Sequence, residues 1–352
     1  MKSILHERPG VYSSYDASAV VRGGRAARTI GVAAKSTSGT ANTAVRLTSY
    51  EMGLSAFGED AAGSPGMSAI LKLLFLGGAS TVVAVRVEGD EYDAAFAVLQ
   101  AAENVQVIVC DSGELTVQQA LRASLESASA ARRERIAVVG MSGASTTELT
   151  DRAKALNSER MVLVGPDGLD SAGKPLPGIF AAAAAAAAVA VIRDPAIPLN
   201  GTKLSGLTGV SEDYGDREID LLVRGGVTPL EAVGGVVSPV RGITTRTMTG
   251  GADDTTWREL TTILIADDVI PAIRQSLRSR FSQTKNTVQT RGAIRAQTIV
   301  ELENKLRAEI IDSYSDVAVS ASEEDPTVCL VEFSFSVAHG LNQIYLTAHI
   351  TI

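Results

Sequence analysis

Four strand-like stretches alternate with three helical ones between residues 81 and 164. The strand-like stretches are rich in valine and isoleucine, without the polar alternation of a half-exposed strand. Strands that are apolar on both faces and separated by helices are typical of βαβ units and a mostly parallel sheet. We therefore expect an α/β core with strands at 81–87, 105–110, 135–139 and 160–164 and helices at 92–102, 117–128 and 147–156.

Eight consecutive alanines, residues 181–188, follow this region. Alanine has the highest helix propensity, and Pro177-Gly178 marks the entry to a helix. A helix without side-chain bulk suits a place where another element comes close, so we expect it to be buried. The α/β core is expected to span residues 26–200.

Residues 201–256 are rich in glycine and threonine and predict β-hairpins and loops. Residues 257–343 predict a C-terminal α+β domain that opens with a strand at 257–265. Asp267-Asp268 is interpreted as the cap of a following helix, with Pro271 in its first turn. A second long helix is expected at 291–311, followed by two strands. The apolar positions expected to face inward are Ile270, Ile273, Leu277 and Phe281 on the first helix, and Ile299, Leu302, Leu306 and Ile310 on the second.

Both ends of the chain are expected to form extended arms. Residues 1–25 contain little that can build a core. Residues 344–352 alternate strictly, which places all their apolar side chains on one face of a strand. Such a strand must pair with the same chain or with a neighbouring copy, because an unpaired apolar edge promotes aggregation. The apolar positions are Ile344, Leu346, Ala348, Ile350 and Ile352.

The bulk composition excludes several classes of protein. A net charge of -8 and a pI of about 5.1 argue against nucleic-acid binding, which needs a cationic surface. Cys110 and Cys329 lie in apolar runs and are interpreted as buried thiols of a reducing compartment. The start of the chain lacks the apolar region of a secretion signal, and the longest apolar run, 179–192, is too short to cross a bilayer. We expect synthesis in the cytoplasm, no secretion signal and no direct insertion into membranes.

Two short motifs approach known chemistry without completing it. Residues 168–174 have the spacing of a phosphate-binding loop, but Pro175 stands where the magnesium-binding Ser or Thr is required. Ser142 follows a strand as a nucleophile would, but the second glycine is displaced by one position. The chain has three histidines, His6, His339 and His349, and none lies in the core.

The two cysteines and three histidines lack the spacing of a zinc site, and the acidic residues lack the spacing of a calcium-binding loop. We therefore expect no catalytic residue, no metal and no cofactor. An α/β enzyme, either a hydrolase or a nucleotide binder, stays as the alternative. One basic cluster has two interpretations with equal weight: a solvated helix face, or a docking face for an acidic protein. It consists of Arg274, Arg278, Arg280 and Lys285.

A family resemblance rests on residues near both ends and in the middle. Pro9-Gly10-Val11-Tyr12 resembles the signature that opens the contractile-tail sheath proteins of myophage-type bacteriophages and of phage-tail-like bacteriocins. The Gly31-Val32-Ala33 strand and the 194–200 segment after the alanine-rich helix are also similar, as is the closing order of elements. Two departures are Ser13-Ser14-Tyr15, where acidic residues are more usual, and a chain that is short for the family.

The resemblance implies a mechanical function. Subunits would form stacked hexameric rings around an inner tail tube, in contact with the tail tube protein and with baseplate and tail terminator proteins. The two arms would add strands to the sheets of neighbouring copies, and contraction would drive the tube through a bacterial envelope. The helix carrying Arg274 and Arg278 would face the tube. The particle would be assembled in the host cytoplasm as a virion tail or a bacteriocin-like particle. A baseplate or other tail component with the same fold stays as an alternative.

Overall fold

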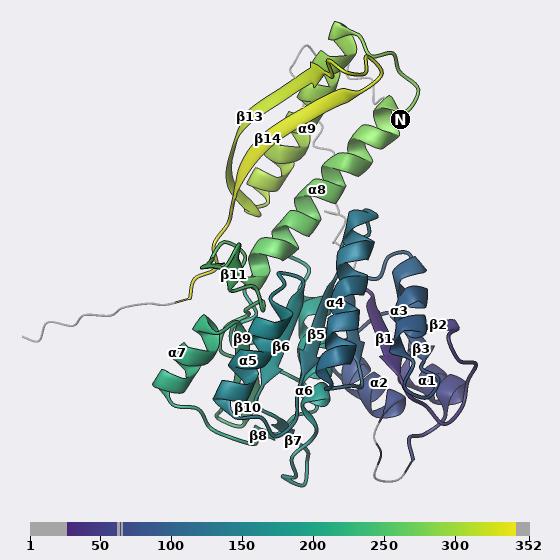
Figure 1. The fold of residues 1–352 in the computed structure, drawn as a ribbon, viewed down its shortest axis with the longest axis vertical. Helices are drawn as coiled ribbons and strands as arrows, with labels where there is room; N and C mark the ends of the chain where they lie inside the picture. The colour runs from purple at the N-terminus through teal and green to yellow at the C-terminus, as the bar shows by residue number, and fades with distance from the viewer. Residues whose placement is uncertain (1–26, 62–63, 65, 343–352) are drawn as a thin grey trace, which may run out of the picture.

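An eight-stranded sheet forms the centre of the molecule within the residues that the structure describes, 27–61, 64 and 66–342 of a computed structural model. The strand order is β10-β9-β6-β5-β4-β1-β3-β2 (Figure 1). All neighbouring pairs are parallel except β10/β9 and β2/β3, one at each edge. The expected mostly parallel α/β core is confirmed. The strands are β1 (Ile30–Ala34), β2 (Ala44–Leu47), β3 (Val82–Arg86), β4 (Val107–Cys110), β5 (Ile136–Gly140), β6 (Met161–Gly165), β9 (Val227–Val233) and β10 (Val236–Pro239).

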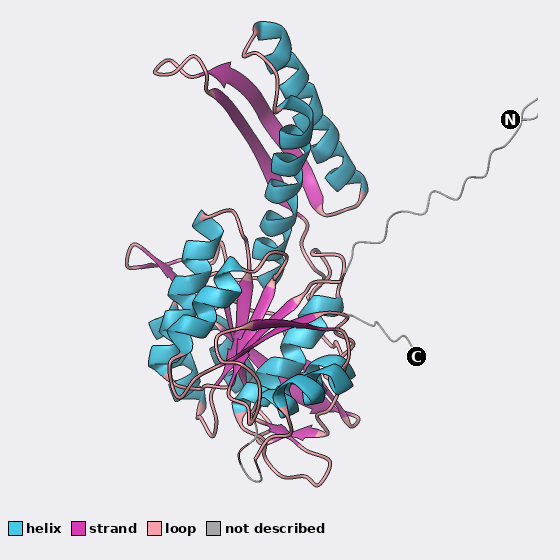
Figure 2. Ribbon diagram, turned by 90° about the vertical axis from the view of Figure 1, so that its right-hand side faces the viewer, coloured by secondary structure: helices cyan, strands magenta, loops and turns pink. Residues whose placement is uncertain are grey.

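Helices cover both faces of this sheet, and together they make the body of the molecule (Figures 1 and 2). Along β4, Val107 and Val109 face one layer while Ile108 and Cys110 face the other, because successive side chains of a strand point to opposite faces. One layer contains α1 (Tyr50–Phe57), α2 (Met67–Leu76) and α6 (Gly178–Val191), and the other contains α3 (Tyr92–Ala101), α4 (Leu115–Ala130), α5 (Thr146–Leu156) and α7 (Asp216–Arg224).

The alanine helix α6 is buried along nearly its whole length, as expected. It packs between α2 and strands β4, β5 and β6. Close contacts explain the small residues: a Cβ on Gly77 would lie 2.5 Å from the Cβ of Ala187, and one on Gly140 would lie 2.2 Å from the carbonyl oxygen of Gly178. A larger side chain at these positions would push the helix off the sheet.

Residues 201–256 contain a helix that the glycine- and threonine-rich composition did not predict. Helix α7 begins after Gly215, whose N–H donates to the Glu218 carboxylate at 2.8 Å. Its signal was Ile219 followed three and four residues later by Leu222 and Val223, which are buried. Strand β9 then pairs with β6 and extends the main sheet. Four short strands complete the body: β7 (Gly168–Leu169), β8 (Gly209–Val210), β11 (Met248–Thr249) and β12 (Ala252–Asp253).

The prediction of a strand at 257–265 is wrong, because the long helix α8 (Leu260–Phe281) already begins at Leu260. Burial of Leu260, Ile263 and Leu264 follows the three- and four-residue spacing of a helix, and this packing overrides the strand propensity of the threonines between them. Asp267-Asp268 is therefore inside the helix and does not cap it. Pro271 also lies inside α8.

Helix α8 leaves the body and forms an elongated lobe with α9 (Val288–Arg307), β13 (Ile311–Ala321) and β14 (Cys329–Val337) (Figure 1). This is the expected C-terminal α+β region, except that α9 ends at Arg307 and Ile311 begins a strand. Ile273, Leu302 and Ile310 are buried as expected, but Ile270 is 42% exposed. Cys110 is buried, whereas Cys329 is only half-buried; both are free thiols.

Candidate interaction surfaces of the lobe and its junction

The lobe carries a two-stranded sheet whose strands pair only with each other among the described residues. Tyr314 lies opposite Phe335 in the antiparallel register, and both side chains pack toward the helices. Ser315 lies opposite Ser334 on the other, exposed face. The outer N–H and C=O groups of both strands therefore have no strand to pair with among the described residues.

The two edges of this hairpin are not equivalent. The register shifts between Ile311 and Ser313 and again between Ser315 and Ala318, so both extra residues lie on β13. Asp316, within the second shift, has a φ of 54°. Bulges twist an edge away from further pairing, whereas an uninterrupted edge is a template for another strand. β14 is the uninterrupted edge, and it is nine residues long.

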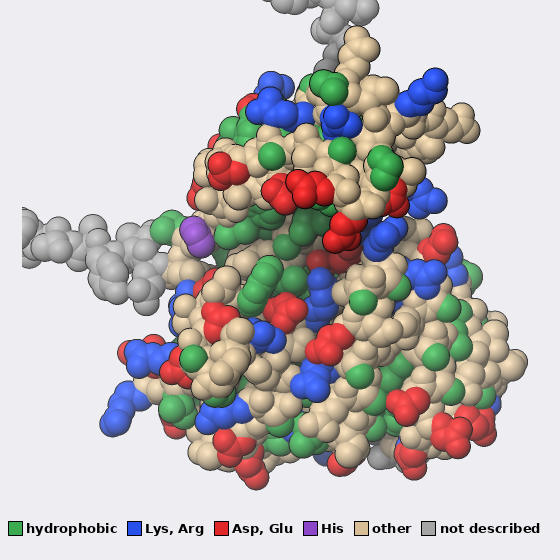
Figure 3. All heavy atoms as spheres, turned by 45° about the horizontal axis from the view of Figure 1, so that its top comes forward, with side chains coloured by type: hydrophobic (Ala, Val, Ile, Leu, Met, Phe, Trp, Pro, Cys, Tyr) green, Lys and Arg blue, Asp and Glu red, His purple; other side chains and the backbone are tan. Residues whose placement is uncertain are grey.

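Two adjacent aspartates of α8 form ion pairs at the junction, one to the body and one within the lobe. Asp267 accepts two hydrogen bonds from the Arg160 guanidinium, at 2.8 and 3.0 Å, and Asp268 accepts one from Lys305 of α9, at 2.6 Å. Burial raises the pKa of Asp267, and the Arg160 hydrogen bonds oppose that shift. The face of the molecule drawn in Figure 3 is hollowed between lobe and body, with acidic and basic side chains on both sides of the hollow.

The four cations named as candidate tube contacts are divided by the structure. Arg274 is partly buried and forms an ion pair with Glu134 of the body, with 2.8 Å between its Nη2 and the carboxylate. Arg278, Arg280 and Lys285 are exposed at the far end of the lobe. Arg274 therefore helps to join lobe and body, and the other three are available to a partner.

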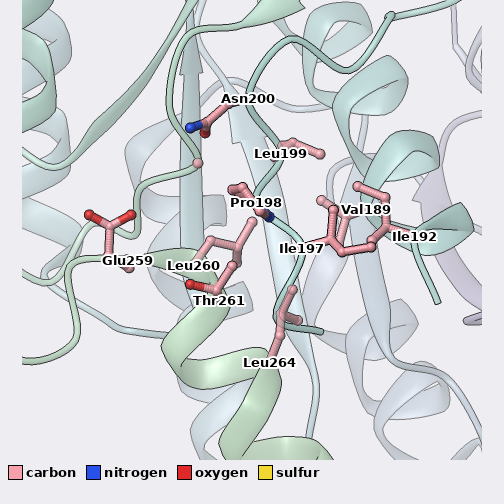
Figure 4. Close-up of a pocket in the computed structure, with 11 residues that line it drawn as sticks. Val189, Ile192, Ile197, Pro198, Leu199, Asn200, Glu259, Leu260, Thr261 and Leu264 are labelled. Atoms are coloured by element: carbon pink, nitrogen blue, oxygen red, sulfur yellow. The ribbon is translucent and has the colours of Figure 1, made fainter. Parts of the chain in front are cut away.

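The described chain begins and ends beside one apolar groove. Arg28 donates to the carbonyl oxygens of Val189 and Ile192 at the end of α6. On the other side, Asn200 and Asn342 form a hydrogen bond of 2.7 Å. Figure 4 shows the groove between the end of α6, the 197–200 segment and the first turns of α8. Residues 1–26 and 343–352 lie outside the described residues, so the predicted contacts of Pro9, Gly10, Val11 and Tyr12 and of the terminal strand stay predictions.

The two incomplete motifs form turns held by their own polar groups. Asp170 accepts the N–H groups of Ala172 and Lys174 at 2.8 and 2.9 Å, as in a polar turn. Ser142 accepts the N–H of Gly178 at 3.0 Å. Across residues 27–61, 64 and 66–342, no three His, Cys, Asp or Glu side chains are grouped to hold a metal ion, and no helix is long and apolar enough to cross a membrane.

Free strand edges and an exposed charged tip on a solid α/β body are features of a protein that assembles with other chains. Residues 86–245 match the phage tail sheath protein central domain, and residues 252–351 match the phage tail sheath C-terminal domain. The chain belongs to the phage tail sheath family.

Individual relatives agree with this assignment. The tail sheath protein of Bacillus phage SP01 is 30% identical over 253 residues, which are 70% of this chain and 43% of that protein. The chain therefore spans less than half the length of this relative. The sheath tail protein of Desulfitobacterium hafniense has a TM-score of 0.71 at 10% identity, over 93% of this chain and 100% of that one. A chain from the contracted helical sheath of the anti-feeding prophage has a TM-score of 0.71 at 15% identity, over 98% and 99%. At such identities the two structures show a shared fold.

Proposed function

We propose that the chain is a structural, non-enzymatic subunit of a contractile tail sheath, which polymerises as stacked hexameric rings around an inner tube. Contraction of the assembly would drive the tube through a bacterial envelope. Family membership supports this function, and so does the matched fold of a chain from a contracted sheath. The observation that carries the proposal is the lobe hairpin, whose uninterrupted β14 edge accepts another strand while the body needs none.

The terminal segment 344–352 fits this edge in length and pattern. It has nine residues, as β14 has, and its apolar side chains share one face. Addition of a strand uses backbone hydrogen bonds for affinity and alternate side chains for register. We place the strand of one copy on β14 of a neighbour, and the Pro9–Tyr12 arm on a neighbour as well, so that rings stay linked while the bodies move.

The tip cations are the proposed contact with the tube. Arg278, Arg280 and Lys285 are exposed, and three like charges in one region attract an acidic surface. We expect R278E/R280E/K285E to lower the sheathed fraction of tubes roughly tenfold when purified sheath protein and tube protein are mixed, because each substitution replaces attraction by repulsion. Electron micrographs give that fraction. Equal sheathing by the triple variant and the wild type would exclude this surface as the contact.

Baseplate and tail terminator proteins are the proposed partners at the two ends of the sheath. The particle is a virion tail or a tail-like particle assembled in the host cytoplasm. Nucleic acid is not a proposed partner, since the net charge is -8. One matched structure, with a TM-score of 0.72 at 15% identity, comes from the baseplate of the anti-feeding prophage, so a baseplate role is the second candidate.

Electron microscopy of the purified protein tests the main proposal. A sheath subunit should polymerise into long, wide, hollow tubes, whereas a baseplate subunit should form closed rings at most. Deletion of residues 344–352 should leave a soluble protein with wild-type circular dichroism and no tubes. The matched control is T347S/T351S, which changes the polar face of the same segment and keeps its apolar side chains; it should polymerise normally. Tubes formed by the truncated protein would exclude the terminal strand as the connector.

A further inference from the structure

A polar cleft of about 500 Å³ lies between the lobe and the body, on the side where the parallel strands begin. Thr29, Thr81 and Gln106 line it just before β1, β3 and β4, and Leu264 of α8 closes it from the lobe. The same cleft is lined by three arginines and three acidic residues. These are Arg28, Arg46 and Arg193, and Glu134, Asp267 and Asp268.

The acidic residues of the cleft are already neutralised. Glu134 pairs with Arg274, Asp267 with Arg160 and Asp268 with Lys305, at 2.6 to 2.8 Å. Two of the arginines are not. The side chains of Arg46 and Arg193 are exposed and have no hydrogen-bond or ion-pair partner among the described residues. The cleft therefore presents excess positive charge and attracts an anionic group.

An anionic group lies at the tip of the lobe hairpin. Glu323, Glu324 and Asp325 are consecutive, exposed and without a cationic partner in the described part of the chain. Hydrogen bonds from Thr327 lower the pKa of Asp325, so its carboxylate is charged. Asn286 of the α8–α9 loop donates to the carbonyl oxygens of Pro326 and Val328, which holds the turn in place.

We propose that the acidic hairpin tip of one copy binds in the arginine cleft of another. The contact cannot form within one molecule, because the β13–β14 turn lies at the end of the lobe opposite the first turns of α8 (Figure 1), and residues of those turns line the cleft. The stretch of α8 between Asp268 and Phe281 alone spans roughly 20 Å at the helical rise per residue. Two different surfaces joined between copies make a heterologous contact, which generates a closed ring or an open helical array. The inference rests on the proposed function and identifies one contact of that array.

A second possible occupant is the chain's own N-terminal segment, since Ala27 lines the cleft. In the sequence, the ten residues before Ala27 include Arg22 and Arg25 and no acidic residue. A basic segment is repelled by Arg46 and Arg193, whereas the hairpin tip is attracted. Charge complementarity therefore favours the second copy as the occupant.

A charge exchange tests the contact. We expect R46E/R193E and E323K/E324K each to raise the protein concentration needed for tube formation at least tenfold, measured by sedimentation and electron microscopy. The quadruple variant, which restores opposite charges, should recover most of that loss. All four side chains are exposed and unpaired, so unchanged circular dichroism is expected. K174E/K203E is the matched control, because these two exposed lysines lie outside the cleft and should leave assembly near wild type.

A second measurement locates the contact directly. In a C329S background, R193C and E324C copies are mixed under oxidising conditions. A covalent dimer should form from the mixture and not from either variant alone. The inference would be overturned if both double variants assembled like the wild type, or if the quadruple variant did not recover assembly. The proposed function would still stand as long as the wild type forms tubes. Assembly lost in R46E/R193E alone, with E323K/E324K unaffected, would also overturn it and would assign the cleft to the N-terminal segment.

Discussion

The body and the lobe treat their strands in opposite ways. In the body, the parallel strands lie between two helical layers, and every strand from β9 to β3 has a neighbour on both sides. In the lobe, β13 and β14 are covered on one face, and each has one neighbour in the described chain. Only β10 and β2, at the two edges of the body sheet, have one neighbour each, whereas both strands of the lobe do.

Charge follows the same division. The body buries Arg135 to 2% exposure and satisfies it with the carbonyl oxygens of Leu99 and Ala102, at 2.6 and 3.2 Å. The outer end of the lobe exposes its charges: Arg278, Arg280 and Lys285 lie at and just beyond the end of α8, and residues 323–325 form the acidic turn. Buried groups satisfied internally stabilise one fold, whereas exposed unpaired charges select partners and orient them.

The junction is where the two regions meet, and breaking it should have the largest effect on the isolated protein. D267N removes the negative charge that pairs with the Arg160 guanidinium. The side chain of Asp267 is only 16% exposed, and that of Arg160 only 11%. Loss of one partner of a buried pair costs about 3 kcal/mol, so we expect the free energy of unfolding to fall by about that amount. Urea denaturation measures it, and hydrogen exchange should show the first turns of α8 opening more often.

D151N is the control for that variant. Asp151 pairs with Lys154 at 3.8 Å on an exposed face of α5, and such pairs contribute less than about 1 kcal/mol. The two substitutions make the same chemical change in different surroundings. Equal losses in both variants would mean that the junction does not depend on the buried pair.

The sequence predicted the regular parts of both regions but not how they join. The apolar runs and the helical stretches between them located β3 to β6 and their helices within two residues at each end, because strands buried on both faces leave a continuous signal. Asp267-Asp268 was misread as a cap, since aspartate before an apolar stretch is a common helix start. Its true partners, Arg160 and Lys305, are 107 and 37 residues away, and no local pattern records a tertiary ion pair. The cleft arginines are equally scattered along the chain and become neighbours only in the fold.

The pH dependence of stability should differ, by a smaller amount, between a buried carboxylate of the body and an exposed one of the lobe. Asp111 accepts hydrogen bonds from the Tyr92 hydroxyl and the Lys35 N–H, at 2.6 and 2.8 Å, and burial raises its pKa above the ordinary 3.8. A raised pKa in the folded state means that folding favours the protonated form. The stability that this group contributes is present below about pH 4 and is lost as pH rises through the raised pKa.

D111N removes this titration while keeping a side chain of the same shape. We expect the free energy of unfolding of the wild type to fall more steeply than that of D111N as the pH rises from about 4, measured by urea denaturation across a pH series. E332Q makes the same carboxylate-to-amide change on the exposed face of β14 and is the control, which should follow the wild type. Parallel curves for wild type and D111N would show that the body accommodates the Asp111 charge as readily as water does.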